Sequence, residues 1–186
     1  MRYWPTGSAG DSPEKINRSS CGETAVATTE RQTMTVSVGE QAPDFTLSDT
    51  DGNQITLSSF RGKHSVTLVF IPFAFTGVCQ GELCELRDNL NSFETADNKV
   101  LAITCDRAPS LKEWKSQEGY NFPLLSDGWP HGEVARAYGC FNEDLGCAER
   151  LTVVVDREGN VADTFASGGL GEARELSSYT DALSKV

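Results

Sequence analysis

The sequence has no apolar run that approaches the roughly 20 residues a helix needs to cross a bilayer. Its first residues also lack the apolar core of a secretory signal, so we expect a cytoplasmic protein. Positive charge is scarce, because 27 acidic residues outnumber 16 basic ones and give a formal net charge of −11. Such a charge opposes phosphate backbones and anionic lipid surfaces, so neither nucleic acid nor a membrane is an expected partner.

Histidine is scarce as well, and two histidines among 186 residues exclude a histidine-rich metal site. We expect neither a metal nor a bound cofactor. The six cysteines do not suggest a disulfide framework, because a reducing cytoplasm keeps thiols free. Cys79 is not part of a Cys-x-x-Cys motif, which argues against a thioredoxin-like disulfide oxidoreductase. Cys140 and Cys147 only weakly indicate a disulfide or a zinc half-site, because no matching ligand pair is visible.

Residues 1–33 differ in composition from the rest of the chain. Ser, Thr, Gly, Glu and Arg dominate there, and the scattered apolar residues follow no period of 2 or 3.6. Such a segment buries too little apolar surface to offset the entropy lost on ordering. We therefore expect residues 1–33 to be a disordered extension, with a docking arm as the alternative, and residues 34–186 to form one domain.

From Met34 onward, patterns typical of strands and helices alternate. Asp51-Gly52-Asn53 separates two short alternating runs and predicts a hairpin turn. Residues 65–71 are nearly all apolar or β-branched, which is typical of a central strand buried on both faces. The order of elements predicts an α/β fold with a central mixed sheet, flanking helices and an N-terminal β-hairpin. Strands are expected at 42–47, 54–57, 65–71, 99–105, 122–125, 150–156 and 161–166, and helices at 78–93, 106–119, 132–138 and 172–186.

Cys79 follows the central strand after a tight loop and falls in the first turn of the next predicted helix. The unpaired N–H groups and the dipole of a helix N-terminus favour an anion, and the thiolate is the nucleophilic form of cysteine. Thr76 lies three residues earlier, where its hydroxyl can cap the helix, donate to a bound peroxide, or do both. The pattern indicates a reactive cysteine.

A thiolate reduces a peroxide by in-line displacement, and negative charge builds on the leaving oxygen. A positive group is therefore needed near Cys79, and it must come from elsewhere in the fold. Arg150 lies at the start of the strand expected at 150–156, and the predicted sheet can place that strand beside residues 65–71. Arg150 is the candidate, with an ordinary surface arginine as the alternative.

The spacing Pro72-x3-Thr76-x2-Cys79 matches the P-x-x-x-T/S-x-x-C signature, and the chain resembles the peroxiredoxin family over nearly its whole length from Met34. The run that starts at Pro72 and continues through Cys79-Gln-Gly-Glu-Leu is similar to the AhpE-type subgroup in particular. Further matching motifs follow in order at 42–47, 122–127, 129–132 and 137–139.

The resemblance implies a thioredoxin fold and assigns roles to several residues. Cys79 would be the peroxide-attacking cysteine, and Pro72 would shield it from water. Thr76 and Arg150 would hold the peroxide and stabilise the thiolate. Glu82 would orient Arg150, although a first-turn acid favoured by the helix dipole is the alternative. Family members commonly form dimers, so a homodimer is expected.

Attack on a peroxide leaves a sulfenic acid that must condense with a thiol. Cys84 lies five residues after Cys79 in the same predicted helix, at an estimated Cα separation of about 8.6 Å. A disulfide allows at most ~7 Å, so the two cysteines can bridge only if the first helical turns unwind. Peroxiredoxins of the PrxQ, or bacterioferritin-comigratory, type resemble this sequence in having a resolving cysteine at +5, whereas AhpE-type proteins usually use one cysteine. Cys84 is the first candidate resolver, with a small buried apolar side chain as its alternative, and Cys147 is the second candidate.

The sequence therefore predicts a thiol-dependent peroxidase for hydrogen peroxide, organic hydroperoxides and peroxynitrite. An internal disulfide between Cys79 and Cys84 would suit thioredoxin as the reductant. A one-cysteine enzyme would instead need an external thiol, and the AhpE resemblance suggests mycothiol with mycoredoxin. A non-enzymatic redox sensor on the same fold is the further alternative.

Overall fold

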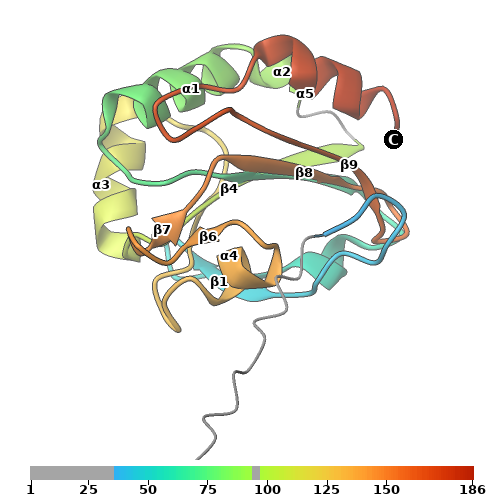
Figure 1. Cartoon of the computed structure of the whole chain (residues 1–186), viewed down its shortest axis with the longest axis horizontal. Helices are drawn as coiled ribbons and strands as arrows, with labels where there is room; N and C mark the ends of the chain where they lie inside the picture. Colours follow the sequence, from blue (N-terminus) through green and yellow to red (C-terminus); the bar gives the residue numbers. More distant parts are fainter. Residues whose placement is uncertain (1–35, 94–96) are drawn as a thin grey trace, which may run out of the picture. The chain divides into compact units, whose positions relative to one another are not determined.

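The computed structural model of the chain describes residues 36–93 and 97–186, and Figure 1 shows the arrangement of its elements. The extension predicted at 1–33 lies outside the described residues. The main sheet has seven strands in the order β2-β1-β5-β4-β3-β8-β9. Their bounds are β1 Thr46–Asp49, β2 Gln54–Thr56, β3 Ser65–Phe70, β4 Asn98–Thr104, β5 Leu124–Ser126, β8 Leu151–Val155 and β9 Val161–Ala166.

The sheet is mixed, as the order of elements predicts. Strand β3 pairs in parallel with β4, and β4 pairs in parallel with β5. The pairs β3–β8, β8–β9, β1–β5 and β1–β2 are antiparallel. The predicted thioredoxin fold is confirmed, and the antiparallel neighbour β8 begins at the end of the sheet where β3 finishes.

The N-terminal hairpin forms where the sequence places a turn. Gly52 has φ 86°, a conformation that favours glycine, between β1 and β2. Asp49 accepts hydrogen bonds at Oδ1 from the backbone N–H groups of Asp51 (2.8 Å) and Asn53 (2.9 Å). Burial by itself raises the pKa of Asp49, but the hydrogen bonds from Asn53 and Asp51 outweigh it and leave the pKa below its usual value.

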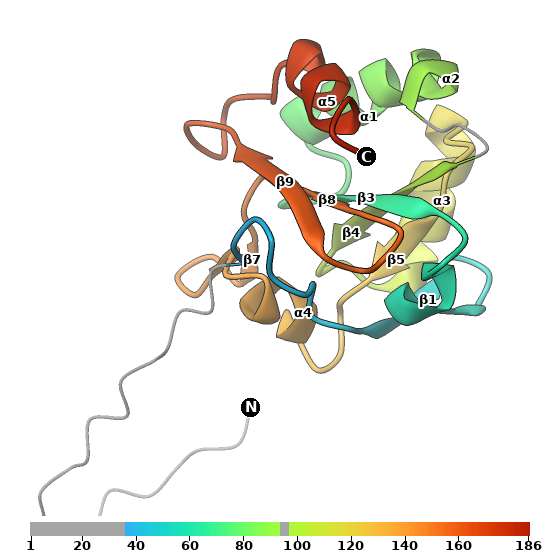
Figure 2. The same cartoon turned by 90° about the vertical axis from the view of Figure 1, so that its right-hand side faces the viewer.

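Strand β3 is buried on both faces because its alternate side chains enter two separate cores. Leu68 and Phe70 face the core that contains α4 (Glu133–Ala137), and Val69 and Ile71 face the core that contains the longer helices. Figure 2 shows this division, with α1 and α5 on one side of the sheet and α4 on the other. The helices of the second core are α1 Gly77–Asp88, α3 Ala108–Glu118 and α5 Leu176–Leu183.

All four predicted helices are shorter in the structure, and two of them differ by several residues. The helix expected at 78–93 ends at Asp88, with Asn89 as its C-cap, and is followed by a separate turn, α2 Leu90–Phe93. The side-chain amide of Asn89 donates to the Glu85 carbonyl (2.9 Å) and competes with the helical pattern. The helix expected at 172–186 begins only at Leu176, because Arg174 is held by other contacts described below.

Two further elements were not predicted. A short 3-10 helix, η1 Leu57–Phe60, follows β2. A small hairpin of β6 Phe141–Asn142 and β7 Cys147–Ala148 occupies a stretch that was expected to be a loop. This hairpin leads directly into Arg150 and β8, so it lies at the end of the sheet where β3 finishes.

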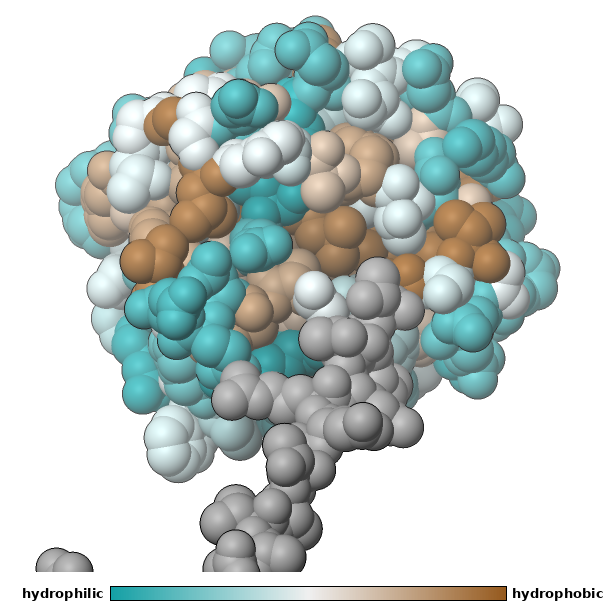
Figure 3. All heavy atoms as spheres, viewed as in Figure 1, coloured by the Kyte–Doolittle hydropathy of each residue, from teal (hydrophilic) through white to brown (hydrophobic). Residues whose placement is uncertain are grey.

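In the part of the chain that the structure describes, no helix is long and apolar enough to span a membrane. Apolar and hydrophilic side chains are interspersed on the face seen in Figure 1 (Figure 3). Among the described residues, the large apolar side chains that stay exposed include Phe73 and Phe75, both in the loop between β3 and α1.

Candidate active site

The loop that connects β3 to α1 is fixed by an acidic side chain from the neighbouring strand. Asp106, just after β4, accepts hydrogen bonds at Oδ2 from the backbone N–H of Ala74 (2.8 Å) and the hydroxyl of Thr104 (2.7 Å). Pro72 is buried at the start of this loop. The loop is therefore held against the ends of strands β3 and β4, and Cys79 follows it in the first turn of α1.

Thr76 stands at the N-cap position of α1 with an extended backbone, but its side chain does not cap the helix. Its hydroxyl donates instead to the carbonyl of Phe73 (3.0 Å), so the predicted capping hydrogen bond is not formed. The side chain is exposed, and its oxygen keeps lone pairs that can accept a hydrogen bond. Thr76 is thus free to contact a molecule that enters above Cys79.

The side chains of Cys79, Arg150 and Glu82 meet in the interior, although Arg150 lies 71 residues after Cys79. Arg150 donates from Nη2 to the Cys79 sulfur (3.1 Å) and from Nη1 to Glu82 Oε2 (2.7 Å). Its Nε donates to the carbonyl of Leu170 (3.0 Å). Cys79 is 1% exposed, and Arg150 and Glu82 are each 3% exposed. The alternative of a surface arginine is therefore wrong.

A second arginine joins this cluster, and no sequence pattern predicted it. Arg174 donates from Nε to Glu82 Oε1 (2.5 Å) and from Nη1 to the hydroxyl of Thr152 (3.1 Å). The hydroxyl of Tyr179 donates to the same Glu82 oxygen (3.3 Å), and burial raises the pKa of Tyr179, which keeps it neutral. The Nη2 atom of Arg174 is buried and finds no acceptor among the described residues.

These contacts explain why α5 starts late and why Glu82 is buried. The backbone N–H of Arg174 also donates to Glu82 (3.3 Å), which holds this segment in a loop instead of a helical turn. Glu82 therefore balances two guanidinium groups, and it is not a solvent-exposed acid at a helix N-terminus.

Comparison with known proteins agrees with this geometry. The model of the AhpC/TSA family matches residues 38–164. The chain belongs to this family. It is a peroxiredoxin, a thiol-dependent peroxidase. It is 51% identical over 152 residues to alkyl hydroperoxide reductase E of Mycobacterium tuberculosis, covering 81% of this chain and 98% of that protein.

The peroxiredoxin is also related to the Bcp type. It is 32% identical over 133 residues to peroxiredoxin Bcp of Escherichia coli, covering 68% of this chain and 83% of that protein. The crystal structure of peroxidoxin BcpB from Mycobacterium tuberculosis matches with a TM-score of 0.70 and 28% identity, over 81% of this chain and 96% of that one.

In the peroxiredoxin, Cys84 faces a different neighbour from Cys79. The Cys84 thiol is half-buried and donates to Glu118 Oε2 (3.6 Å) at the end of α3, and its sulfur lies 4.0 Å from the Tyr120 hydroxyl. The five cysteines that the structure describes are all free thiols. Cys84 therefore contacts α3 and not the Arg150 cluster.

The other three described cysteines are buried near the β6–β7 hairpin. Burial raises the pKa of Cys105 to about 12, and it also raises the pKa of Cys140 and of Cys147. Cys147 is fully buried three residues before Arg150. Within the described residues, no group of acidic, histidine or cysteine side chains is arranged to hold a metal.

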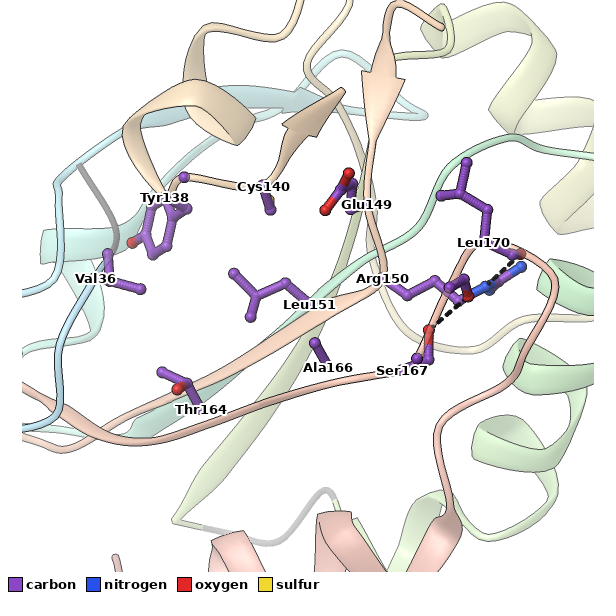
Figure 4. Close-up of a pocket in the computed structure, with 13 residues that line it drawn as sticks. Val36, Tyr138, Cys140, Glu149, Arg150, Leu151, Thr164, Ala166, Ser167 and Leu170 are labelled. Carbon is purple, nitrogen blue, oxygen red and sulfur yellow. Dashed lines mark hydrogen bonds between the residues drawn. The ribbon is translucent and has the colours of Figure 1, made fainter. Parts of the chain in front are cut away.

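A cavity of about 340 Å³ is lined in part by Arg150 (Figure 4). Tyr138, Leu151 and Thr164 line it, together with the loop that contains Leu170. Cys79 does not line this cavity.

Proposed function

We propose that Cys79 is the peroxide-attacking residue of this peroxiredoxin. The Cys79 thiolate attacks the terminal oxygen of a hydroperoxide, a sulfur–oxygen bond forms, and the oxygen–oxygen bond breaks. Cys79 becomes a sulfenic acid, and the leaving alkoxide or hydroxide takes up a proton to become an alcohol or water. The observation that carries the proposal is the hydrogen bond from Arg150 to the Cys79 sulfur inside a buried cluster.

The charges of this cluster support a thiolate. Arg150 and Arg174 carry two positive charges, and Glu82 supplies one negative charge. A thiolate at Cys79 brings the buried total to zero, whereas a neutral thiol leaves one charge uncompensated in the interior. In this proposal Glu82 orients both guanidinium groups, and Arg150 is the group that contacts the peroxide.

Thr76 and Pro72 complete the proposed site. Because the Thr76 hydroxyl hydrogen is used on Phe73, its oxygen is available to accept a hydrogen bond from the O–H of a hydroperoxide. Buried Pro72 lacks an N–H and shields the sulfur from water. Together with Arg150, Thr76 would hold the two peroxide oxygens in line with the sulfur.

For the next step we propose Cys84 as the resolving cysteine and Cys147 as the second choice. Cys84 is half-buried in the same helix, whereas Cys147 is fully buried, so Cys84 needs less rearrangement to reach Cys79. The similarity to Bcp supports the two-cysteine route with thioredoxin as reductant. The similarity to alkyl hydroperoxide reductase E supports the one-cysteine alternative, with mycothiol and mycoredoxin.

The name of the relative with 51% identity supports organic hydroperoxides as substrates beside hydrogen peroxide, and peroxynitrite is retained as a third. The redox-sensor alternative would keep the reaction at Cys79 but would lack turnover. The cytoplasmic location and the homodimer stay predictions from the sequence.

The test is to treat reduced protein with a small excess of hydroperoxide and follow the products by intact and peptide mass spectrometry. We expect a sulfenic acid at Cys79 within the first phase. Water is then lost as a disulfide joins Cys79 to Cys84, which leaves a product two hydrogens lighter than the reduced protein. Cys79→Ser should slow peroxide consumption by at least about a thousandfold. Cys84→Ser should keep the first phase and accumulate the sulfenic acid; rapid oxidation of Cys79→Ser would overturn the proposal.

A further inference from the structure

One side chain connects α3 to the two turns of α1 that contain the proposed resolving cysteine. Glu118, the last residue of α3, accepts at Oε1 from the Gln80 amide (2.7 Å) and at Oε2 from the Cys84 thiol. Its backbone carbonyl accepts a hydrogen bond from Arg87. We call these contacts the Glu118 clasp. They hold Gln80 and Cys84 in the closed helix.

Between the two cysteines lies a residue that weakens the same helix. Gly81 is exposed in the interior of α1, where glycine is a poor helix former because the unfolded chain gains entropy there. A Cβ atom added at Gly81 would meet nothing within 4 Å, and its φ is not in the left-handed region. Neither packing nor backbone conformation therefore requires a glycine at this position.

Glu82, next to Gly81, is held by the two buried arginines and resists movement of this stretch. Oxidation changes that balance, because a neutral sulfenic acid at Cys79 no longer offsets the second guanidinium charge. The opposing contributions at Gly81 and Glu118 then decide how often the first turns of α1 open.

We propose that Gly81 and Glu118 are positioning residues for the resolving step, with Gly81 favouring the open helix and Glu118 the closed one. The inference rests on the proposed role of Cys84. In the open form, the Cys84 thiol leaves Glu118, and its sulfur attacks the Cys79 sulfenic acid. The sulfur–sulfur bond forms, the sulfur–oxygen bond breaks, and the departing hydroxide takes the thiol proton to become water.

The experiment separates the two steps by stopped flow, with tryptophan fluorescence as the signal. Trp114 is fully buried and its ring lies 5.8 Å from that of Phe75, so it reports on this loop. Rapid quench and mass spectrometry assign each phase. Gly81→Ala should slow the peroxide-independent phase about fivefold, and Glu118→Ala should accelerate it about five- to tenfold.

In both variants the peroxide-dependent phase should stay within about twofold of the parent, a split that general destabilisation would not produce. Glu113→Ala is the matched control, since it removes an exposed acid of the same helix whose side chain bonds to Gln117 within α3. The longer-lived sulfenic acid of Gly81→Ala should also be overoxidised at lower peroxide concentration.

The possible failures are distinguishable. If Cys84→Ser leaves the lifetime of the sulfenic acid unchanged, the proposed resolver is wrong and this inference fails with it. If Cys84→Ser prolongs that lifetime while Gly81→Ala and Glu118→Ala leave the second phase unchanged, only the present inference fails. A slower second phase in Glu118→Ala would overturn the clasp, because it would show that Glu118 assists the chemistry.

Discussion

Cys79 and Cys84 occupy the same helix, yet their surroundings are of opposite kinds. Cys79 is buried against a guanidinium group that is itself held by a buried carboxylate. Cys84 is half-buried and bonds weakly across to Glu118, at the exposed end of another helix. Cys79 is thus held by buried charges that water screens little. Cys84 is held by a weak, partly exposed hydrogen bond, which costs less free energy to break.

The difference matches the two steps that the enzyme must perform. Attack on a peroxide gains from donors that are already in place when charge develops, so rigidity accelerates it. Resolution by Cys84, as proposed, requires the first turns of α1 to open, so rigidity slows it. In the proposed mechanism, helix α1 can serve both steps only if the surroundings of Cys79 are more stable than those of Cys84.

The largest effect on the stability of the buried surroundings of Cys79 is expected when the charge of Glu82 is removed. Glu82→Gln leaves the two buried arginines with one counter-charge at most, the proposed Cys79 thiolate, and we expect a loss of about 3–5 kcal/mol in the free energy of unfolding. Urea denaturation at constant pH measures it. Glu113→Gln removes an exposed acid and should change stability by less than about 0.5 kcal/mol. A loss below 1 kcal/mol in Glu82→Gln would show that the cluster does not stabilise the fold.

A second variant tests the buried surroundings of Cys79 alone. Arg150→Lys keeps a positive charge but loses the planar group that reaches Cys79, Glu82 and Leu170 together. We expect the peroxide-dependent phase to slow by about 10²–10³-fold, with the resolving phase changed by less than about threefold. Stopped-flow measurement resolves both. Arg157→Lys, at an exposed ion pair with Asp97, is the control, and equal slowing of both phases would contradict the separation.

Hydrogen exchange directly tests whether the part of α1 around Cys84 opens more easily than the sheet. In the reduced protein, amides of residues 80–85 should exchange at least about tenfold faster than those of the buried strands β3 and β8. Mass spectrometry of peptides, or NMR, gives these rates. Gly81→Ala should restore part of the protection in α1 without affecting the strands. Equal protection of helix and strands would show that α1 opens only with the whole domain.

The smallest effect concerns the thiols outside this helix. At neutral pH, iodoacetamide should modify Cys84 while leaving Cys105 intact, because a buried thiol with a pKa of about 12 has almost no thiolate. The rate at Cys105 should rise about tenfold for each pH unit, as long as the fold persists, until that pKa is reached. Peptide mapping after timed quenching checks it. Rapid labelling of Cys105 at pH 7 would mean that its strand end opens readily.

The sequence was sufficient for the parts of the site that depend on strand order. The long apolar run at 65–71 identified the central strand, and the strand after Arg150 could be placed beside it. That placement brought Arg150 to Cys79, as the structure shows. The turn at Asp51-Gly52-Asn53 was predictable because glycine tolerates the positive φ that such a turn requires.

Arg174 could not be found in this way. It lies in a stretch that looks like the start of an amphipathic helix, and its contact with Glu82 crosses 92 residues of sequence. The break at Asn89 escaped prediction for a related reason, because the apolar spacing continues past it to Leu90. Hydrophobic periodicity indicates which apolar side chains are buried, but it does not indicate which polar side chains form hydrogen bonds with one another.

The order of synthesis adds a consequence to the position of Arg174. Glu82 is joined to partners 68, 92 and 97 residues further along the chain. On the ribosome, Cys79 therefore emerges long before either of its arginines is made. In the proposed mechanism, the arginine cluster that stabilises the Cys79 thiolate therefore forms only after Arg174 has been made, as the last part of the sheet and helix α5 complete the domain.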